Sequence, residues 1–245
     1  MLEVAGLRKS FGSLLVTDDV SFTLAAGARE AVIGPNGAGK TTLFNLLSGE
    51  LRPDAGTIRL AGRDVTRLAP DRRVRAGLAR SFQRNNLFFG MTVAESLATA
   101  VALRTGESRV FWRPFAGARA VHERAAQLAE SVGLAERLHA EVRHLSYGSQ
   151  RQLEIALALA AAPRLLLLDE PTAGMSPEET KTMQRLIAGL PRELTLLLIE
   201  HDMDVVFEMA ERITVLDYGK VLVQGTPDEI RRSPVVKQIY LGEAA

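Results

Sequence analysis

The chain has 245 residues, of which 47% are hydrophobic and 24% are charged, and its formal net charge is +1. This composition predicts a globular protein with a substantial core and excludes a largely disordered chain. The balanced charge gives the whole molecule no strong attraction to nucleic acid or anionic lipid, and the absence of cysteine excludes disulfides and Cys-based metal sites.

The chain shows no sign of a targeting or membrane-spanning segment. Its first residues, 1–4, lack the basic stretch and apolar run of a signal peptide. The most apolar stretch, 153–168, is interrupted by Glu154, Pro163 and Arg164, and no run reaches the roughly 20 apolar residues that span a bilayer. We therefore expect a soluble chain that contacts a membrane only through partners.

The predicted elements of the first third are strands. Residues 20–24 alternate between apolar and polar, and residues 30–33 form a short apolar run before a glycine-rich segment. Residues 57–60 and 63–65 flank Ala61-Gly62, which predicts two strands joined by a turn.

The predicted elements of the middle third are helices. Residues 93–103 and 119–132 are rich in strong helix formers. Residues 104–117 contain glycine and proline and are predicted to be a loop. A third helix over 148–162 should end before Pro163.

In the last third, strands alternate with helices. Ser176, Pro177 and Glu179 are typical of a helix start, as N-cap, first helical residue and partner in a capping box. The alternation predicts an α/β core, in which the helical middle third is an inserted subdomain. The expected strands are 165–168, 195–199 and a hairpin of 213–216 with 221–224.

A phosphate-binding loop is the first chemical motif. Its pattern is G-x-x-x-x-G-K-[ST], with Thr42 directly after it. The glycines let backbone N–H groups turn toward phosphate oxygens, and the following helix, 41–48, directs its N-terminal dipole at the anion. Lys40 should reach the β- and γ-phosphates, and the Thr41 hydroxyl should ligate Mg²⁺. The segment reads Gly34-Pro35-Asn36-Gly37-Ala38-Gly39-Lys40-Thr41.

An acidic pair follows the apolar strand 165–168. The carboxyl ends of parallel strands face the ligand crevice of an α/β sheet. Asp169 is therefore expected to help hold Mg²⁺ near the phosphates, and Glu170 to orient the attacking water. The alternative, two solvated acids at a strand end, becomes the weaker interpretation beside the phosphate loop.

A third motif gives a family resemblance. The segment Leu145-Ser146-Tyr147-Gly148-Ser149-Gln150 looks like the Leu-Ser-Gly-Gly-Gln signature of ABC transporter ATPases, and it precedes the acidic pair as that family requires. It opens a helix whose N-terminus can hold a phosphate. In the family, this phosphate belongs to nucleotide bound on the opposing subunit. Tyr147 and Ser149 depart from the signature, whereas Ser146 and Gly148 match its phosphate-facing positions.

The resemblance implies roles for three more residues. Phe11 matches the aromatic residue that stacks on adenine, with a core Phe as the alternative. Gln83 matches the glutamine that touches Mg²⁺ and water, with an exposed loop residue as the alternative. His201 matches the histidine that contacts the γ-phosphate. Ser176 stands where the family often has Asp, which puts communication between the two nucleotide sites through that residue in question.

Several segments resemble the ATPases of branched-chain amino acid importers in particular. They include residues 77–83, 151–156, 200–203 and the ending Tyr240-Leu241-Gly242-Glu243. The loop 104–117 resembles an insertion of that group and carries Phe111, Trp112 and Phe115, which would either dock a membrane subunit or pack the loop down. ATPases of lipopolysaccharide export share the Leu-Gly-Glu ending, but Tyr147 speaks against them; urea and amide importers are a further alternative.

Two other classes of protein are alternatives to a transporter subunit. An ABC ATPase that acts on nucleic acid usually carries long insertions or two fused ATPase domains, and neither fits in this length. A binding-only subunit with a dead site is disfavoured by Lys40, Asp169, Glu170 and His201. The cluster of arginines could suggest phosphate binding, but Asp71 and the balanced charge favour a solvated face; its members are Arg72, Arg73, Arg75, Arg80 and Arg84.

Taken as a whole, the resemblance implies an α/β fold: a P-loop NTPase (ABC ATPase) core with an antiparallel β subdomain and an inserted α-helical subdomain. It covers 1–245 as one ATP-binding domain, with the helical subdomain at roughly 88–162. The implied cofactors are ATP and Mg²⁺. The implied partners are transmembrane permease subunits and a second ATPase subunit, identical or paralogous, with no nucleic acid. The implied location is peripheral, on the cytoplasmic face of a prokaryotic membrane.

Overall fold

The computed structural model describes residues 1–81, 87–105 and 119–241. The chain divides into two compact units, each of which is described by itself. Unit 1 is formed by 1–80, 164–170 and 191–245, and unit 2 by 81–163 and 171–190.

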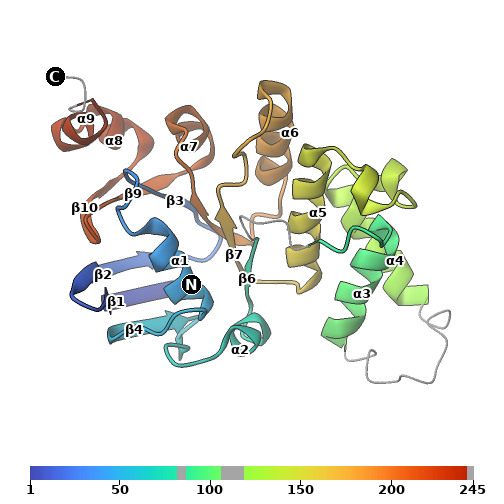
Figure 1. Cartoon of the computed structure of the whole chain (residues 1–245), viewed down its shortest axis with the longest axis horizontal. Coiled ribbons are helices and arrows are strands. Elements are labelled where there is room, and N and C mark those ends of the chain that lie inside the picture. Colours follow the sequence, from blue (N-terminus) through green and yellow to red (C-terminus); the bar gives the residue numbers. More distant parts are fainter. Residues whose placement is uncertain (82–86, 106–118, 242–245) are drawn as a thin grey trace. The chain divides into compact units, whose positions relative to one another are not determined.

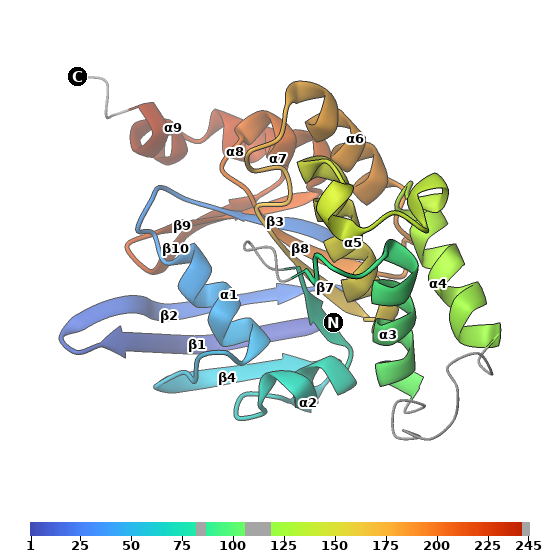
Figure 2. The ribbon, with the colours of Figure 1, turned by 45° about the vertical axis from the view of Figure 1, so that its right-hand side comes forward.

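Unit 1 contains a six-stranded sheet in the order β10-β9-β3-β8-β7-β6. Strands β10, β9, β3, β7 and β6 are labelled in Figure 1, and β8 is labelled in Figure 2. Neighbouring strands from β9 to β6 are parallel, and β10 pairs antiparallel with β9. The three central strands are buried along their whole length, which explains why they read as uninterrupted apolar runs. The bounds are β3 Arg29–Ile33, β6 Leu78–Arg80, β7 Leu165–Asp169, β8 Thr195–Ile199, β9 Arg212–Asp217 and β10 Lys220–Gly225.

A second, four-stranded antiparallel sheet has the order β2-β1-β4-β5. Leu2 pairs with Leu24 on one side and with Leu60 on the other, and all three side chains are buried. Alternate residues of these strands point outward, which is the pattern of a sheet with one face on a core. The bounds are β1 Leu2–Phe11, β2 Leu14–Leu24, β4 Ala55–Leu60 and β5 Arg63–Asp64.

Helix α1, Lys40–Ser48, lies between the two sheets of unit 1 (Figure 2). Its buried side chains include Leu43, Phe44 and Leu47, which join one hydrophobic core with residues of both sheets. The helix ends at Gly49, whose positive φ of 88° lets its N–H donate to the Asn45 carbonyl. The core therefore anchors the helix that follows the predicted phosphate loop.

The remaining helices of unit 1 are short, and α7 and α8 begin at side-chain caps. The Asp202 side chain caps α7, and Thr226 forms a capping box with Glu229 at the start of α8. Among the described residues, none of the helices combines the length and apolarity needed to cross a bilayer. The bounds are α2 Pro70–Arg75, α7 Met203–Met209, α8 Pro227–Arg232 and α9 Pro234–Leu241.

Unit 2 is helical. Helices α3, α4 and α5 pack on one another, and α5 also contacts α6 (Figure 1). The predicted loop from Arg104 begins too early, because α3 continues through Thr105; residues 106–118, with the three loop aromatics, lie outside the described part. The bounds are α3 Val93–Thr105, α4 Arg119–Ser131, α5 Tyr147–Ala160, α6 Pro177–Ala188 and the 3₁₀ helices Ala135–Arg137 and Val142–His144.

Candidate functional site

The predicted phosphate loop connects the carboxyl end of β3 to the start of α1. Gly34 has a φ of +156°, and a Cβ there would lie 2.2 Å from the Leu216 carbonyl oxygen. Gly39 has a φ of +98°, and a Cβ there would lie 2.7 Å from the Val16 carbonyl oxygen. Both positions therefore exclude a side chain, so the two glycines are required for this close packing of backbone on backbone.

The turn between β9 and β10 supports the loop from one side. The Gly219 N–H donates to the Ala38 carbonyl at 3.0 Å, and the Gly219 carbonyl accepts from the Asp18 N–H at 2.8 Å. The loop is thus tied to strand β2 through a neighbouring turn.

Lys40, the first residue of α1, folds back over the loop. Its Nζ donates to the Gly34 carbonyl at 2.6 Å and to the Pro35 carbonyl at 3.0 Å. Burial lowers the pKa of Lys40, and the nearby carboxylates of Glu170 and Asp169 raise it in part. The ammonium group is therefore held in a partly desolvated place within electrostatic reach of both acids.

The N-terminal end of α1 carries no capping side chain, and no acidic residue lies in its first turn. An α-helix leaves its first N–H groups without intrahelical partners, and its dipole places partial positive charge there. Thr41 is exposed and Thr42 half-buried at this end. Within the described residues, the arrangement is that of an anion-binding helix terminus.

Asp169 and Glu170 lie at the carboxyl end of β7, as predicted. Asp169 is 2% exposed. Glu170 has a φ of +46°, a conformation that is uncommon for a residue with a side chain, and its N–H donates to the Ile199 carbonyl at 2.9 Å. Local backbone strain of this kind is often found at functional sites, where the surrounding structure holds it in place.

His201 follows the neighbouring strand β8 and lies beside Glu170. Its Nδ1 is 4.0 Å from Oε1 of Glu170 and 3.8 Å from Oε2 of the buried Glu200. The His201 side chain is 60% exposed. The structure therefore brings Lys40, Asp169, Glu170 and His201 together in unit 1.

The expectation that the arginine cluster forms a solvated face is wrong for two of its members. Arg73 is 0% exposed, and the Arg80 side chain is 7% exposed. Arg72 and Arg75 are exposed as expected, and Arg84 lies outside the described residues. The physical reason is that each buried guanidinium finds acceptors on α1, which is distant in the sequence.

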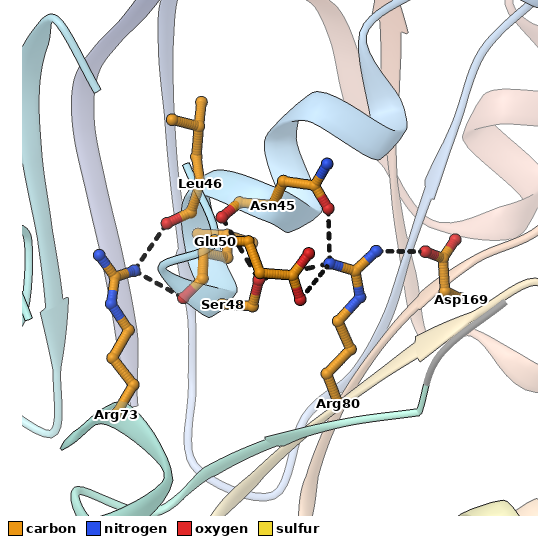
Figure 3. A network of polar contacts seen from close by, with 8 residues as sticks. Asn45, Leu46, Ser48, Glu50, Arg73, Arg80 and Asp169 are labelled. Carbon is orange, nitrogen blue, oxygen red and sulfur yellow. Dashed lines mark hydrogen bonds and ion pairs between the residues drawn. The ribbon is translucent and has the colours of Figure 1, made fainter. Parts of the chain in front are cut away.

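Arg73 donates to four backbone carbonyls. Two of them, of Leu46 and Leu47, belong to the last turn of α1, and the others are those of Thr66 and Leu68. Figure 3 shows the bond of Arg73 to the Leu46 carbonyl. Burial lowers the pKa of Arg73 to about 10. Its positive charge therefore lies at the negative end of the α1 dipole, where it is favourable.

Arg80 joins the same helix to the acidic pair (Figure 3). Its Nη2 donates to Oδ2 of Asp169 at 2.6 Å. Its Nη1 donates to Oδ1 of Asn45 at 2.6 Å and to Oγ of Ser48 at 3.3 Å, and it lies 3.4 Å from Oε1 of Glu50. This network is not apparent in the sequence; its one signal is an arginine placed at the end of a buried strand.

The predicted signature segment lies in unit 2, where it opens α5. Ser146 is the N-cap, and its Oγ accepts from the Ser149 N–H at 3.3 Å. The Gly148 N–H donates to Oε1 of Glu179 at 3.2 Å, and a Cβ on Gly148 would lie 2.7 Å from the same oxygen. Tyr147 is exposed and faces Gly174. Glu179 was predicted only as part of a capping box, and its second contact, to the signature segment, was missed.

Phe11 and Gln83 are the two other residues for which the sequence predicted a role in the site. Phe11 ends β1 with an exposed ring, and Lys9 Nζ lies 5.7 Å from the ring centroid, so Phe11 is not the core residue of the alternative interpretation. Gln83 lies outside the described residues. The remaining loop residues, Asn36 and Gly37, belong to the turn before Ala38.

Comparison with known proteins agrees with this geometry. The family model described as "ABC transporter" matches residues 17–173, and the model described as "Branched-chain amino acid ATP-binding cassette transporter" matches residues 220–245. The solved ADP conformation of MJ1267, an ATP-binding cassette of an ABC transporter, has a TM-score of 0.86 at 27% identity and covers 99% of this chain and 98% of that one.

Curated relatives cover the chain from end to end. The high-affinity branched-chain amino acid transport ATP-binding protein LivG of Salmonella typhimurium is 44% identical over 100% of this chain and 98% of its own length. BraF of Pseudomonas aeruginosa, of the same description, is 42% identical over the same shares. The lipopolysaccharide export ATP-binding protein LptB of Acidithiobacillus ferridurans is 38% identical over 99% and 97%. The predicted fold and resemblance are confirmed: the chain belongs to the ABC transporter family, among its ATP-binding proteins.

Proposed function

We propose that this chain is the ATP-hydrolysing subunit of an importer for branched-chain amino acids. The observation that carries the proposal is the phosphate loop with Lys40, Asp169, Glu170 and His201 gathered at one place in a chain that resembles LivG over its full length. Its substrate at this site is ATP.

ATP binding begins at the N-terminal end of α1. The backbone N–H groups there receive the phosphates, and Lys40 exchanges its present acceptors, the Gly34 and Pro35 carbonyls, for β- and γ-phosphate oxygens. The ammonium is already partly desolvated, so its attraction to an added anion is stronger than in water. The exposed Phe11 ring receives the adenine by stacking.

The donor set at this place fits Mg²⁺. Magnesium prefers oxygen ligands and usually takes one or two from the protein, with the rest from water and substrate phosphates. The Thr41 hydroxyl and the Asp169 carboxylate would supply the protein's share at this place, and the family resemblance adds Gln83, which lies outside the described residues. When bound, the ion would neutralise charge that develops on the phosphates during hydrolysis.

Hydrolysis depends on side chains that direct water. Glu170 accepts a hydrogen bond from the attacking water and turns the water's lone pair toward the γ-phosphorus. His201, beside Glu170, donates to a γ-phosphate oxygen. In this scheme the strained conformation of Glu170 keeps its carboxylate at the end of β7 instead of letting it turn into bulk solvent.

The site is complete only with a second ATPase subunit. The segment 146–149 would hold the γ-phosphate of nucleotide bound to that partner, which is either an identical chain or a paralogue. ATP then stabilises the closed pair by mass action, and hydrolysis reopens it. Permease subunits in the membrane would convert this cycle into transport, with this chain on the cytoplasmic face.

The choice of branched-chain amino acids rests on the similarity to LivG and BraF, which exceeds that to the lipopolysaccharide export proteins. The test is to purify the membrane proteins that accompany this chain, reconstitute them with it and with the cognate solute-binding protein in liposomes, and measure ATP-dependent uptake of labelled leucine. Uptake of leucine, isoleucine and valine but not of urea is the expected result. ATP hydrolysis without uptake of any of the three would contradict the assigned substrate.

A further inference from the structure

Arg80 connects three parts of unit 1 through one side chain. It is the last residue of β6, which pairs in parallel with β7, so its backbone is fixed by the sheet. One guanidinium nitrogen meets Asp169, and another meets Asn45 and Ser48 on the last turns of α1 (Figure 3). The guanidinium carbon also lies 5.8 Å from the centroid of the Phe44 ring.

The shape of this contact requires an arginine. The guanidinium group is planar and presents several N–H donors in a rigid fork, whereas a lysine ammonium is a point charge on a flexible stem. Here two different nitrogens of the fork bind two separate elements, both at 2.6 Å. A fork held at α1 by Asn45 therefore determines where the Asp169 carboxylate can point.

Carboxylates that ligate metal ions are commonly held by hydrogen bonds from a second layer of residues. Those outer partners orient the ligand, and their loss typically weakens metal binding. Arg80 is such an outer partner of Asp169, which is buried and is the last residue of β7.

Arg73 provides an internal comparison. It is also buried and also bonds to the C-terminal end of α1, but its four acceptors are main-chain carbonyls. It therefore supports the position of the helix without a bond to the acidic pair. Variants of the two arginines can therefore distinguish an effect on the position of α1 from an effect on the orientation of Asp169.

We propose that Arg80 is a positioning residue that orients the Asp169 carboxylate for Mg²⁺ and ties this orientation to the helix that follows the phosphate loop. The proposal rests on the function proposed above, because it assumes that nucleotide binds at this loop together with Mg²⁺.

The test measures the affinity of the full chain for a non-hydrolysable β,γ-imido analogue of ATP, in EDTA and in saturating Mg²⁺. The ratio of the two dissociation constants is the Mg²⁺ enhancement. In Arg80→Gln we expect affinity in EDTA close to that of the wild type and a Mg²⁺ enhancement reduced about tenfold. Arg80→Lys keeps the charge but lacks the guanidinium fork that bonds to both α1 and Asp169. Its Mg²⁺ enhancement should lie between those of the wild type and Arg80→Gln.

Arg73→Lys is the matched control. It should lower the unfolding temperature, because it removes hydrogen bonds to buried carbonyls, and leave the Mg²⁺ enhancement at its wild-type value. If Arg80→Gln does not fold, Asn45→Ala removes the bond that holds the fork at α1 and should reduce the enhancement in the same direction, by less.

The results of these measurements distinguish a failure of the role proposed for Arg80 from a failure of the proposed function. A wild-type or stronger Mg²⁺ enhancement in Arg80→Gln and Asn45→Ala would overturn the role of Arg80 and leave nucleotide binding intact. Equal loss of enhancement in Arg73→Lys would overturn it too, because general support of α1 would then suffice. A wild-type chain that does not bind the analogue, or binds it without any Mg²⁺ effect, would refute the proposed function along with Arg80.

Discussion

Two helices of this chain begin at predicted phosphate-binding segments, and their N-terminal ends are prepared in different ways. At α1 the N-cap is Gly39, with no side chain to bond the first amides. At α5 the N-cap is Ser146, which accepts from the Ser149 N–H, while Glu179 accepts from the Gly148 N–H. One end lacks a side-chain cap, and the other is already capped within unit 2.

The difference shows what each end requires of a ligand. A phosphate at α1 meets a helix end whose N-cap, Gly39, has no side chain to bond its amides, beside a buried Lys40 and the acids at the end of β7. A phosphate at α5 has to share or displace the hydrogen bonds that Ser146 and Glu179 accept from the first amides of the helix. We therefore expect unit 1 to supply most of the nucleotide affinity, and the α5 end to respond to the γ-phosphate of a partner's nucleotide.

The largest expected effect is a loss of ATP turnover in unit 1 without a loss of ATP affinity. Glu170→Gln keeps the size of the side chain but removes the charge that directs water, so we expect ATP turnover to fall about a hundredfold or more. ATP affinity should remain near the wild-type value. Glu193→Gln, an exposed acid of the same unit, is the control and should hydrolyse ATP normally. Unchanged turnover in Glu170→Gln would remove Glu170 from the mechanism.

The next effect concerns the backbone of the phosphate loop. Gly34→Ala would place a methyl group 2.2 Å from the Leu216 carbonyl oxygen in a residue with positive φ. We expect a loss of about 2–4 kcal/mol in the free energy of unfolding, measured by urea denaturation. Gly62→Ala shares a positive φ but has open space around it, and should lose only about 1 kcal/mol. Equal losses in the two variants would contradict the close packing at Gly34.

A smaller effect tests the cap at α5. Ser146→Ala removes the side-chain acceptor of the Ser149 N–H and should reduce the free energy of unfolding by about 1 kcal/mol. It should also slow ATP turnover by the assembled complex, because Ser146 is proposed to hold phosphate. Thr226→Ala removes the comparable cap of α8 and should cost similar stability without slowing turnover. Matching turnover in both variants would assign Ser146 to stability alone.

The smallest effect is a pH dependence. Hydrogen bonds from the Ser176 and Gly148 backbone lower the pKa of Glu179 below its ordinary 4.5. Between the lower folded pKa and 4.5 the unfolded chain binds more protons, so this stabilisation is fully present above 4.5 and is lost as the pH falls through the folded pKa. Glu179→Gln should therefore show a flatter decline of unfolding temperature below pH 4.5. A decline as steep as in the wild type would mean that these bonds contribute little.

Much of the fold follows from local patterns in the sequence. The apolar run 165–168 and the cap at Ser176 predict a strand and a helix start that the structure confirms, because both depend on residues close in the chain. The hairpin of β9 and β10 was predicted in the same way. Strand β1 and helix α2 were not predicted, since their sequences are mixed and their positions depend on tertiary packing.

The residues of the candidate site also fall into those predicted from short segments and those that depend on tertiary contacts. The phosphate loop and the acidic pair were predicted because their chemistry lies in short segments. Arg73 and Arg80 were misread as a solvated face, because arginine is rarely buried without acceptors and theirs come from α1 and β7. The contact of Glu179 with Gly148 was missed for the same reason: the two residues meet only after α5 and α6 have packed.

The nucleotide site is proposed to lie at the start of α1, and the affinity of the chain for ATP tests this placement. Isothermal titration of ATP into the wild-type chain and into Lys40→Ala compares the two affinities, with circular dichroism to verify that both are folded. We expect the wild type to bind ATP and Lys40→Ala to bind it at least about tenfold more weakly, because a charge-assisted contact to phosphate is lost. Equal affinity in the two chains would contradict this placement of the site.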